Sequence, residues 1–594
     1  MTASPHAARL SPTRLRRSGV RGIHVARGAI RASELWLAMV AAGVGALSGL
    51  ATVGVSTAAR TLQKLFYGIA ADERLSTIPT LGLDRLPYLP LGGLLLGLLT
   101  WAWMRRRGAP IVDPVEANAL RGGKMSARDS LFLGLQSLIS NGFGASVGLE
   151  AAYAQLGGAI ASITGGALNL RRSDLRTFVG AGAGAGIAAA FGAPITGAFY
   201  AFEIIIGSYT AANIAPVAAA ALAGALVSRL LGNNTLVFHT QVADPLTASH
   251  YLMFALLGVI CAFAGVTVMR LVALMEGAVS RLPGPRWLRP AVGGVILAGL
   301  AWFAPETLSA GHGAMHFDFA AELGVGTLLV LLLAKTAASV VALGFGFRGG
   351  LFFASLYLGS LLGRLCVVAL YSFGVNVGVD PLTGALVGMG ALAVSIIGGP
   401  FTMSFLVLET TQDFALAAAT LTASIVASLV VRETFGYSFS TWRLHLRGET
   451  IRSAHDVGWL RTLTAGRMMR TGVPTASETM PIDQFRDLFP LGSTRRVVAL
   501  DSAGRYAGII AVSAAHADVG QAATTGDLAG LTKVSLEPEM SIKEIMSAFD
   551  AAESDELAVL DADGRLLGLL SEGHATRRYA QELEGARRDL TGEG

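Results

Sequence analysis

Apolar segments recur along most of the chain, from about Leu35 to Val431, with few charged residues between them. The clear ones begin near Leu35, Leu89, Asn213, Tyr251, Pro290, Leu323, Leu351 and Ala415. Two more, at 178–206 and 384–409, are interrupted by Gly and Pro, and many segments are shorter than the roughly 20 residues that a straight membrane span needs. Interrupted helices are tolerated in a bilayer only where protein covers them or where they line a polar cavity. The pattern predicts an all-α polytopic membrane protein with discontinuous helices and a transport pathway.

The membrane part contains an internal repeat. FGAPITGAFYAFE (191–203) is similar to IGGPFTMSFLVLE (397–409), and GFGASVGLEAAYAQLGG (142–158) is similar to GFGFRGGLFFASLYLGS (344–360). Both pairs have nearly the same spacing, which predicts two homologous membrane repeats at 34–235 and 236–445. Repeats in transporters often have inverted topology, with the binding site at their interface.

After His445 the chain becomes charged and has no apolar span. VVALDSAGRYAGII (497–510) is similar to LAVLDADGRLLGLL (557–570), and each predicts a strand, a turn and a strand. PIDQFRDLF and SIKEIMSAF, which precede them, have helical periodicity. We expect a linker at 446–465, a paired α/β domain at 466–582 and a short tail at 583–594.

Composition agrees with a membrane protein. Of 594 residues, 52% are hydrophobic and only 15% are charged, against about 25% charged in ordinary soluble domains. Residues 1–33 are rich in Arg and contain no acid, which predicts a basic tail on the cytoplasmic side. We expect a multi-pass protein of a bacterial inner (plasma) membrane, with the C-terminal domain also cytoplasmic if the number of spans is even.

Several other kinds of function are excluded. Cys261 and Cys366 lie in apolar stretches, so neither a disulfide framework nor a cysteine metal site is expected. His312 and His316 are four residues apart, but their Gly-rich run is not expected to be helical, and no metal is predicted there. No nucleophile–base pair or phosphate loop is present, so the chain is not expected to be an enzyme or to bind nucleic acid.

Two Gly-rich loops that lead into apolar helices carry the candidate chemistry. An anion that crosses a membrane must replace part of its water, and N–H groups at helix N-termini can do this without binding too tightly. The loops GASVGLE and GFRGGLFF occupy corresponding positions in the two repeats, but only the first ends in an acid, Glu150, which aligns with Phe352. A carboxylate within a membrane segment is costly and marks function. We predict that Glu150 occupies the anion site and leaves it when protonated; the alternative is a structural helix cap.

These segments together resemble the CLC chloride channel and transporter family over about 35–445. GASVGLEAAYAQLGG, GGLFFASLYLGSLLG, FGAPITGAFYAFE, GGPFTMSFLVLETT and FAPETLSAGHG carry the resemblance. It implies an inverted-repeat CLC fold, a homodimer with one pore per subunit, and chloride or a similar small anion as the ion conducted. Glu150 falls on the family's gating glutamate, and the anion-binding backbone N–H groups are expected at Gly148, Gly350, Leu351 and Phe352.

The chain departs from the family pattern at the inner anion site. The loop whose Ser coordinates the central anion aligns with PIVDP (110–114), where Ile111 takes the place of the Ser. The family's pore Tyr aligns near Ser440, with Tyr437 close by but out of register. The inner-site candidates are Ile111, Val112, Tyr437 and Ser440.

A further departure concerns proton coupling. In the family's exchangers a second glutamate follows the one that matches Glu203, and here that position is Ile204. The departure favours a passive anion channel gated by Glu150, and the alternative is an anion/proton antiporter for chloride, fluoride or nitrate. Glu203, mirrored by Glu409, is expected to be structural.

Two cations and the C-terminal domain complete the predictions. Lys335 and Arg348 are expected to snorkel or to lie in loops, and an electrostatic role at a pore mouth is the alternative. The C-terminal domain resembles paired CBS (cystathionine-β-synthase) domains. Its ribose-binding pattern is poor, since GLLSEGH keeps Ser571 but has His574 in place of Asp. No cofactor is therefore expected, and an adenine nucleotide at the CBS-like pair is the alternative.

Overall fold

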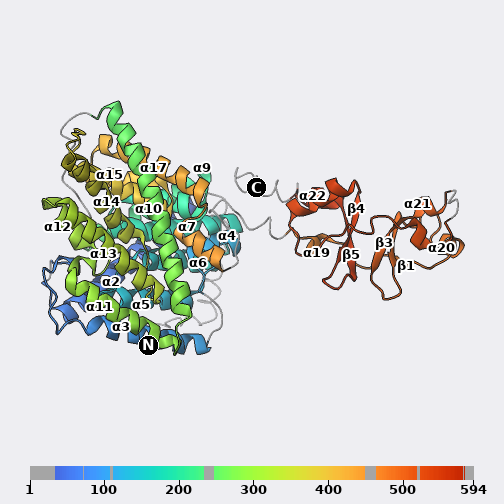
Figure 1. Ribbon diagram of the computed structural model, residues 1–594, viewed down its shortest axis with the longest axis horizontal. Coiled ribbons are helices and arrows are strands. Elements are labelled where there is room, and N and C mark those ends of the chain that lie inside the picture. Colours follow the sequence, from blue (N-terminus) through green and yellow to red (C-terminus); the bar gives the residue numbers. More distant parts are fainter. Residues whose placement is uncertain are drawn as a thin grey trace, which may run out of the picture. The chain divides into compact units, whose positions relative to one another are not determined.

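The structure, a computed structural model, describes residues 34–70, 73–106, 111–232, 246–447, 463–517, 522–579 and 581. The chain forms two compact units, Met1–Asp456 and Val457–Gly594 (Figure 1). The predicted basic tail (1–33), most of the predicted linker (446–465) and the terminal tail (583–594) lie outside the described residues.

The first unit is built from helices, which follow the two predicted repeats. The first repeat contains α2 (Glu34–Tyr67), η1 (Leu75–Thr77), α3 (Tyr88–Arg106), α4 (Pro114–Leu120), α5 (Ala127–Gly142), α6 (Glu150–Ala167), α7 (Arg172–Phe191), α8 (Pro194–Tyr200), the π-helical turn η2 (Ala201–Ile206) and α9 (Ala211–Leu230). The second contains α10 (Ala248–Ser280), η3 (Arg286–Leu288), α11 (Arg289–Phe303), η4 (Pro305–Thr307), α12 (His312–Ala320), α13 (Val325–Gly344), α14 (Phe352–Ser372), α15 (Pro381–Ile397), α16 (Pro400–Thr411), α17 (Phe414–Thr434) and α18 (Phe439–Leu446).

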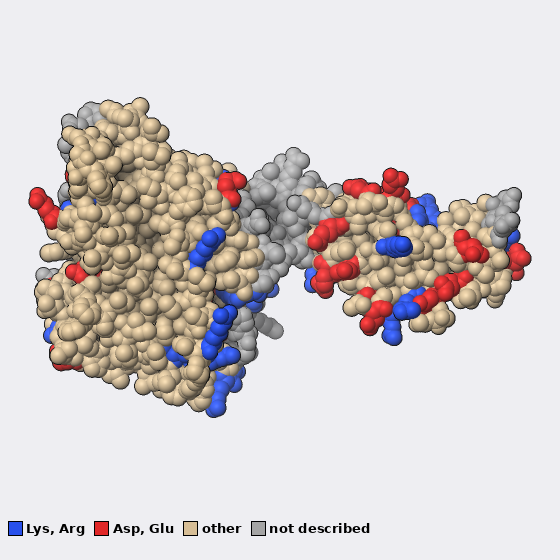
Figure 2. Space-filling view, viewed as in Figure 1, with Lys and Arg blue, Asp and Glu red and all other residues tan. Residues whose placement is uncertain are grey.

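The predicted apolar segments form helices, which confirms the helical membrane fold. Within the described residues, six helices are long and apolar enough to cross a membrane, and they begin at Glu34, Ala211, Ala248, Val325, Phe352 and Phe414. Figure 2 shows few charged side chains on the visible face of this unit.

The predicted interruptions occur at corresponding places in the two repeats. The helix α7 ends at Phe191, its C-cap residue Gly192 has a left-handed φ of 66°, and α8 starts at Pro194. In the second repeat, Gly398 and Gly399 have φ values of 87° and 76°, and α16 starts at Pro400. Glycine tolerates these dihedrals, and proline suits the first turn of a helix because its missing N–H would be unpaired there.

Glycine pairs bring helices together in the same way in both repeats. A Cβ added to Gly157 of α6 would lie 2.1 Å from the carbonyl oxygen of Gly182 in α7. A Cβ on Gly359 of α14 would likewise lie 2.3 Å from the carbonyl oxygen of Gly388 in α15. Only glycine allows such close backbone approach. These glycines therefore let α6 pack closely against α7, and α14 against α15.

The expectation that the run around His312 is irregular was wrong. Residues His312–Ala320 form α12, preceded by Gly311 with a φ of 96°. The hydroxyl of Ser76 accepts hydrogen bonds from the N–H groups of Gly313 (3.0 Å) and Ala314 (3.1 Å). A cap from a distant part of the chain therefore satisfies the first turn of this helix.

The second unit has the predicted repeat of strand, turn and strand. The strands β1 (Thr475–Ser477), β2 (Arg496–Leu500) and β3 (Tyr506–Ala511) form one sheet in that order, and β4 (Glu556–Leu560) and β5 (Leu566–Ser571) form another. The helices are α19 (Ala465–Met468), α20 (Ile482–Leu488), α21 (Val512–Ala515), η6 (Thr525–Leu528) and α22 (Ile542–Ala552). Figure 2 shows many charged side chains on its visible face.

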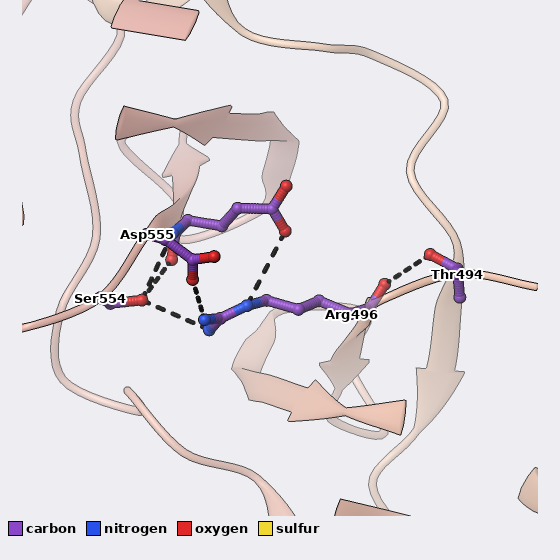
Figure 3. A network of polar contacts seen from close by, with 5 residues as sticks. Thr494, Arg496, Ser554 and Asp555 are labelled. Atoms are coloured by element: carbon purple, nitrogen blue, oxygen red, sulfur yellow. Dashed lines mark hydrogen bonds and ion pairs between the residues drawn. The ribbon is translucent and has the colours of Figure 1, made fainter. Parts of the chain in front are cut away.

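Polar contacts join the two halves of this unit. Arg496 of β2 forms ion pairs with Asp555 and with Glu556 of β4 (3.9 Å), and it donates to the hydroxyl of Ser554 at 3.3 Å (Figure 3). A backbone hydrogen bond from Tyr506 to Gly564 (3.0 Å) connects the two strand turns. The two halves therefore pack as one paired domain.

Candidate anion pathway

The site begins where the two repeats meet. Gly148, just before α6, pairs in antiparallel fashion with Gly350, just before α14, through reciprocal N–H···O bonds of 2.9 and 3.0 Å. The N-termini of α6 and α14 therefore converge on one place from the two repeats. The first N–H groups of a helix have no intrahelical partner and carry about half a positive charge, so this place favours an anion.

The carboxylate of Glu150 lies in this place. Its side chain is 4% exposed, and it faces the N–H groups of Phe353 and of Glu150 itself. A Cβ on Gly148 would lie 1.9 Å from Oε2, and a Cβ on Gly350 would lie 3.4 Å from it. Among the described residues, no donor satisfies Oε2 with a hydrogen bond. The carboxylate therefore sits beside the start of α14, as the tethered-anion hypothesis requires.

Of the four predicted anion-binding N–H groups, those of Gly148 and Gly350 bond to each other's carbonyls instead, so that part of the prediction was wrong. Leu351 and Phe352 lie at the first turn of α14. Leu351 is the N-cap residue and Phe352 is the first helical residue, and both are buried. Phe353, which sequence reasoning missed, also faces the carboxylate. The repeat could have suggested it, since a helix start offers several successive N–H groups rather than one or two.

A cavity of about 610 Å³ opens onto Glu150. The side chains that line it include the cations Arg60 and Arg74, the imidazoles His312 and His316, and the acid Glu73. The imidazole of His312 stacks on the ring of Phe353, with 3.4 Å between centroids and 17° between planes. We call this space the outer cavity, and Glu150 is one of the residues that line it.

A polar network holds the loop that precedes Glu150. The Asn141 amide donates to the carbonyl of Val147 at 2.8 Å and to the hydroxyl of Ser309 at 3.0 Å. Gln63 donates in turn to the Asn141 side-chain oxygen at 3.0 Å. These residues position the loop between α5 and α6, and no sequence signal singled them out because they come from three distant segments.

Lys335 extends this network and corrects the expectation that it snorkels. Its side chain is 1% exposed, and Nζ donates to the carbonyls of Thr307 (3.0 Å) and Ser309 (2.8 Å). The carbonyl groups of the η4 loop replace the water that a snorkelling lysine would reach. Arg348 was predicted to snorkel or to lie in a loop, and it lies in the loop between α13 and α14. Its backbone N–H donates to the hydroxyl of Ser140 at 2.9 Å.

A second cavity, of about 660 Å³, lies in the same unit. Of the four inner-site candidates only Tyr437 lines it, together with Glu203 and Ile204, whereas Ile111, Val112 and Ser440 do not. The Tyr437 hydroxyl lies 3.2 Å from Nδ1 of His445. We call this space the inner cavity.

Glu203 and Glu409 form a matched pair across the two repeats. The carboxylate of Glu203 accepts hydrogen bonds from the N–H groups of Phe401 (3.1 Å) and Thr402 (2.8 Å) at the start of α16. The carboxylate of Glu409 accepts from Ile195 (2.9 Å) and Thr196 (2.8 Å) at the start of α8. Each acid thus caps a helix of the other repeat, which is the geometry of an approximate two-fold axis.

The fold and this site define a membrane transport protein of the inverted-repeat type. The family described as voltage gated chloride channel matches residues 92–432, which is more than half of the chain. The chain therefore belongs to the voltage-gated chloride channel (CLC) family. Within the described residues, no three His, Cys, Asp or Glu side chains gather as a metal site would need.

Known relatives and solved structures agree with this family. A ClcB-like chloride channel protein of Ralstonia nicotianae is 30% identical over 404 residues, covering 66% of this chain and 93% of that protein. The voltage-gated ClC-type chloride channel ClcB of Escherichia coli is 28% identical over 401 residues, covering 66% and 95%. The crystal structure of a slow cyanobacterial Cl⁻/H⁺ antiporter is similar with a TM-score of 0.61 and 23% identity, covering 69% of this chain and 97% of that one. A eukaryotic CLC transporter reaches 0.59 at 17% identity and covers 93% of this chain and 98% of that one.

Proposed function

We propose that this protein exchanges a small anion, chloride in the first instance, for protons across a bacterial inner membrane. The observation that supports this most is the Glu150 carboxylate between the starts of α6 and α14, at the floor of the outer cavity. A group in that position binds a proton and competes with an anion for the same N–H groups. Solved neighbours that are described as Cl⁻/H⁺ and fluoride/proton antiporters add support.

The exchange follows from the charge of one side chain. Ionised Glu150 occupies the anion site, because negative charge is stabilised at two helix N-termini. Protonation removes that charge, so the side chain leaves the site and an anion takes its place. Loss of the proton restores the competing carboxylate, which expels the anion. The anion therefore occupies the N–H groups at the start of α14, among them those of Leu351 and Phe352, when Glu150 is protonated, and anion and proton move in opposite directions.

Passive conduction is the second candidate. Ile204 cannot carry a proton from the inner cavity, which it lines together with Glu203. A channel would still use Glu150 as a gate, with the anion flowing down its gradient.

Simultaneous recording of anion efflux and proton uptake in proteoliposomes separates the two. With an outward chloride gradient and no proton gradient, we expect uphill proton uptake that stops in Glu150→Gln while chloride efflux persists. Glu433→Gln is the matched control, because Glu433 is an exposed acid of α17. Chloride efflux without proton movement in the wild type would establish the channel instead, and no efflux at all would reject both.

Two assembly properties extend the proposal. We infer that the protein is a homodimer with one pore per subunit. We also infer that the basic N-terminal tail and the C-terminal CBS-like domain lie on the cytoplasmic side. Cross-linking in native vesicles tests the first, and protease access to the C-terminal domain in sealed inside-out vesicles tests the second. An adenine nucleotide at the CBS-like pair would appear as a nucleotide-dependent rise in its melting temperature.

A further inference from the structure

Ser309, in the wall of the outer cavity, has a backbone conformation that serine rarely adopts. Its φ of 54° is left-handed. This conformation is uncommon for a residue with a side chain, and it persists only where the surrounding structure holds it in place. Strained residues of this kind gather at functional sites, and Ser309 lines the same cavity as Glu150.

Four hydrogen bonds hold Ser309 in this conformation. Its N–H donates to the carbonyl of Gly144 at 2.9 Å, and its carbonyl accepts from Nζ of Lys335 at 2.8 Å. Its hydroxyl accepts from the side-chain amides of Asn141 at 3.0 Å and Gln63 at 3.4 Å. The N–H, the carbonyl and the hydroxyl of Ser309 are therefore all bonded, to partners from α2, α5, the loop after α5, and α13.

Two of these bonds connect Ser309 to residues 143–149, the loop that leads to Glu150. One is the bond to Gly144, which lies in this loop. The other runs through Asn141, whose amide nitrogen also donates to the carbonyl of Val147 at 2.8 Å. A shift of Ser309 would therefore act on the loop at two points.

The helix α13 of the second repeat reaches the same loop by two contacts. The hydroxyl of Ser339 lies 3.2 Å from that of Ser146 in the loop, and both side chains are buried. One helical turn earlier, Nζ of the buried Lys335 donates to the carbonyls of Thr307 (3.0 Å) and Ser309 (2.8 Å). The loop before Glu150 is thus held by α13 directly through Ser339, and through Ser309 by way of Lys335.

We propose that Lys335 and Ser339 are positioning residues that set how firmly the Glu150 carboxylate competes with the anion. The inference rests on the competition between carboxylate and anion that the proposed function requires. Lys335 keeps Ser309 in its left-handed conformation, and Ser309 in turn fixes the loop before Glu150. Without this bond Ser309 relaxes, the loop shifts, and the carboxylate occupies the space at the start of α14 for less of the time.

The alternative is that Lys335 only satisfies two carbonyl groups and so contributes to stability. Loss of stability reduces the amount of active protein and thus the maximal rate of chloride efflux. It does not change the chloride concentration at which efflux is half-maximal. Weaker competition from Glu150 lowers that concentration, because chloride then meets less of its competitor, so the half-maximal concentration separates positioning from stability.

The test measures chloride efflux from proteoliposomes that contain the full-length protein, over a range of internal chloride concentrations. In Lys335→Met, which removes the donor and keeps a long side chain, we expect the half-maximal concentration to fall about fivefold, as for an equilibrium that loses one hydrogen bond. We expect a fall in the same direction in Ser339→Ala, a small change that serves if Lys335→Met does not fold. Lys124→Met, at an exposed lysine, is the matched control and should equal the wild type.

The same substitutions in the Glu150→Gln background identify the route of the effect. Substitutions that act through one shared interaction are not additive. Glu150→Gln lacks the competing carboxylate, so Lys335→Met and Ser339→Ala should leave its half-maximal chloride concentration unchanged.

Three other outcomes would contradict the inference. An unchanged half-maximal concentration in Ser339→Ala, and in Lys335→Met where it folds, would overturn it and leave the proposed exchange standing. An equal fall in the Glu150→Gln background would also overturn it, because the loop would then act on the anion site without the carboxylate. A Glu150→Gln variant with the half-maximal concentration of the wild type would reject the competition itself, and with it both the exchange and the inference.

Discussion

The Glu150 carboxylate can stay between the two helix starts because Gly148 and Gly350, which lie beside it, have no side chains. A Cβ on Gly148 would lie 1.9 Å from Oε2, which no pair of atoms tolerates without movement. The nearest obstacle is the end of a flexible side chain, so the carboxylate rather than the backbone would yield. At the residue scale, glycine thus decides where the competing charge lies.

Gly148→Ala tests this directly. We expect the displaced carboxylate to compete less well for the site, so chloride efflux at neutral pH rises towards that of Glu150→Gln. Gly166→Ala, in the helix α6 that follows Gly148, is the control, since a Cβ there meets nothing within 4 Å. Efflux and pH dependence in Gly148→Ala that equal those of the wild type would contradict the placement of the carboxylate.

Sequence reasoning found Glu150 because an acid in an apolar run is conspicuous. It could not find Phe353 or Asn141, and it named Lys335 without its partners, because the surroundings of these residues come from the other repeat or from distant loops. Lys335 in particular looks like a snorkelling residue until the η4 carbonyls that surround Nζ are known.

At the scale of helices, the reciprocal caps by Glu203 and Glu409 join the two repeats. Removing either carboxylate leaves the N–H groups of Phe401 and Thr402, or of Ile195 and Thr196, without these acceptors. We expect Glu203→Ala and Glu409→Ala each to lower the free energy of unfolding by about 1–3 kcal/mol.

Thermal unfolding in detergent measures this effect. The exposed residue Glu433 supplies the control, and Glu433→Ala should change stability by less than about 0.5 kcal/mol. Equal melting temperatures for all three variants would show that the caps do not hold the repeats together.

The helix α22 of the C-terminal domain offers a pH-dependent test. The N–H of Ser541, and then its hydroxyl, donate to Glu544 and hold the pKa of that carboxyl below its usual 4.5. A pKa depressed by folding means that this cap stabilises α22 fully above pH 4.5 and is lost as the pH falls further.

Hydrogen exchange of α22 in the full-length protein, corrected for intrinsic rates, should therefore accelerate below about pH 4.5. In Glu544→Gln this acceleration should be weaker, because Gln has no charge to lose. The helix α20, which has no side-chain cap at its N-terminus, is the internal control. Identical pH profiles for the wild type and Glu544→Gln would contradict the role of the cap.

The sequence patterns predicted most helices, because apolar runs and Gly–Pro breaks are local signals. They missed α12, because its first turn is capped by Ser76, which is far away in the sequence. The patterns also named Ile111, Val112 and Ser440 as inner-site candidates, but these residues do not line the inner cavity. Alignment to a motif gives a position in the chain but not the direction of a side chain.

In the whole molecule, neither repeat forms the proposed anion site alone. Each supplies one helix start, and the pairing of Gly148 with Gly350 brings the two together. The repeated motifs predicted this convergence, whereas the two cavities depend on packing among segments that the motifs do not include.

Anomalous diffraction from crystals of the Glu150→Gln variant grown with bromide locates the anion directly. We predict a bromide peak within hydrogen-bonding distance of the N–H groups of Phe352 and Phe353, in the space that the Glu150 carboxylate occupies in the wild type. A variant with intact helices and no bromide between the starts of α6 and α14 would contradict the proposal that carboxylate and anion compete for one site.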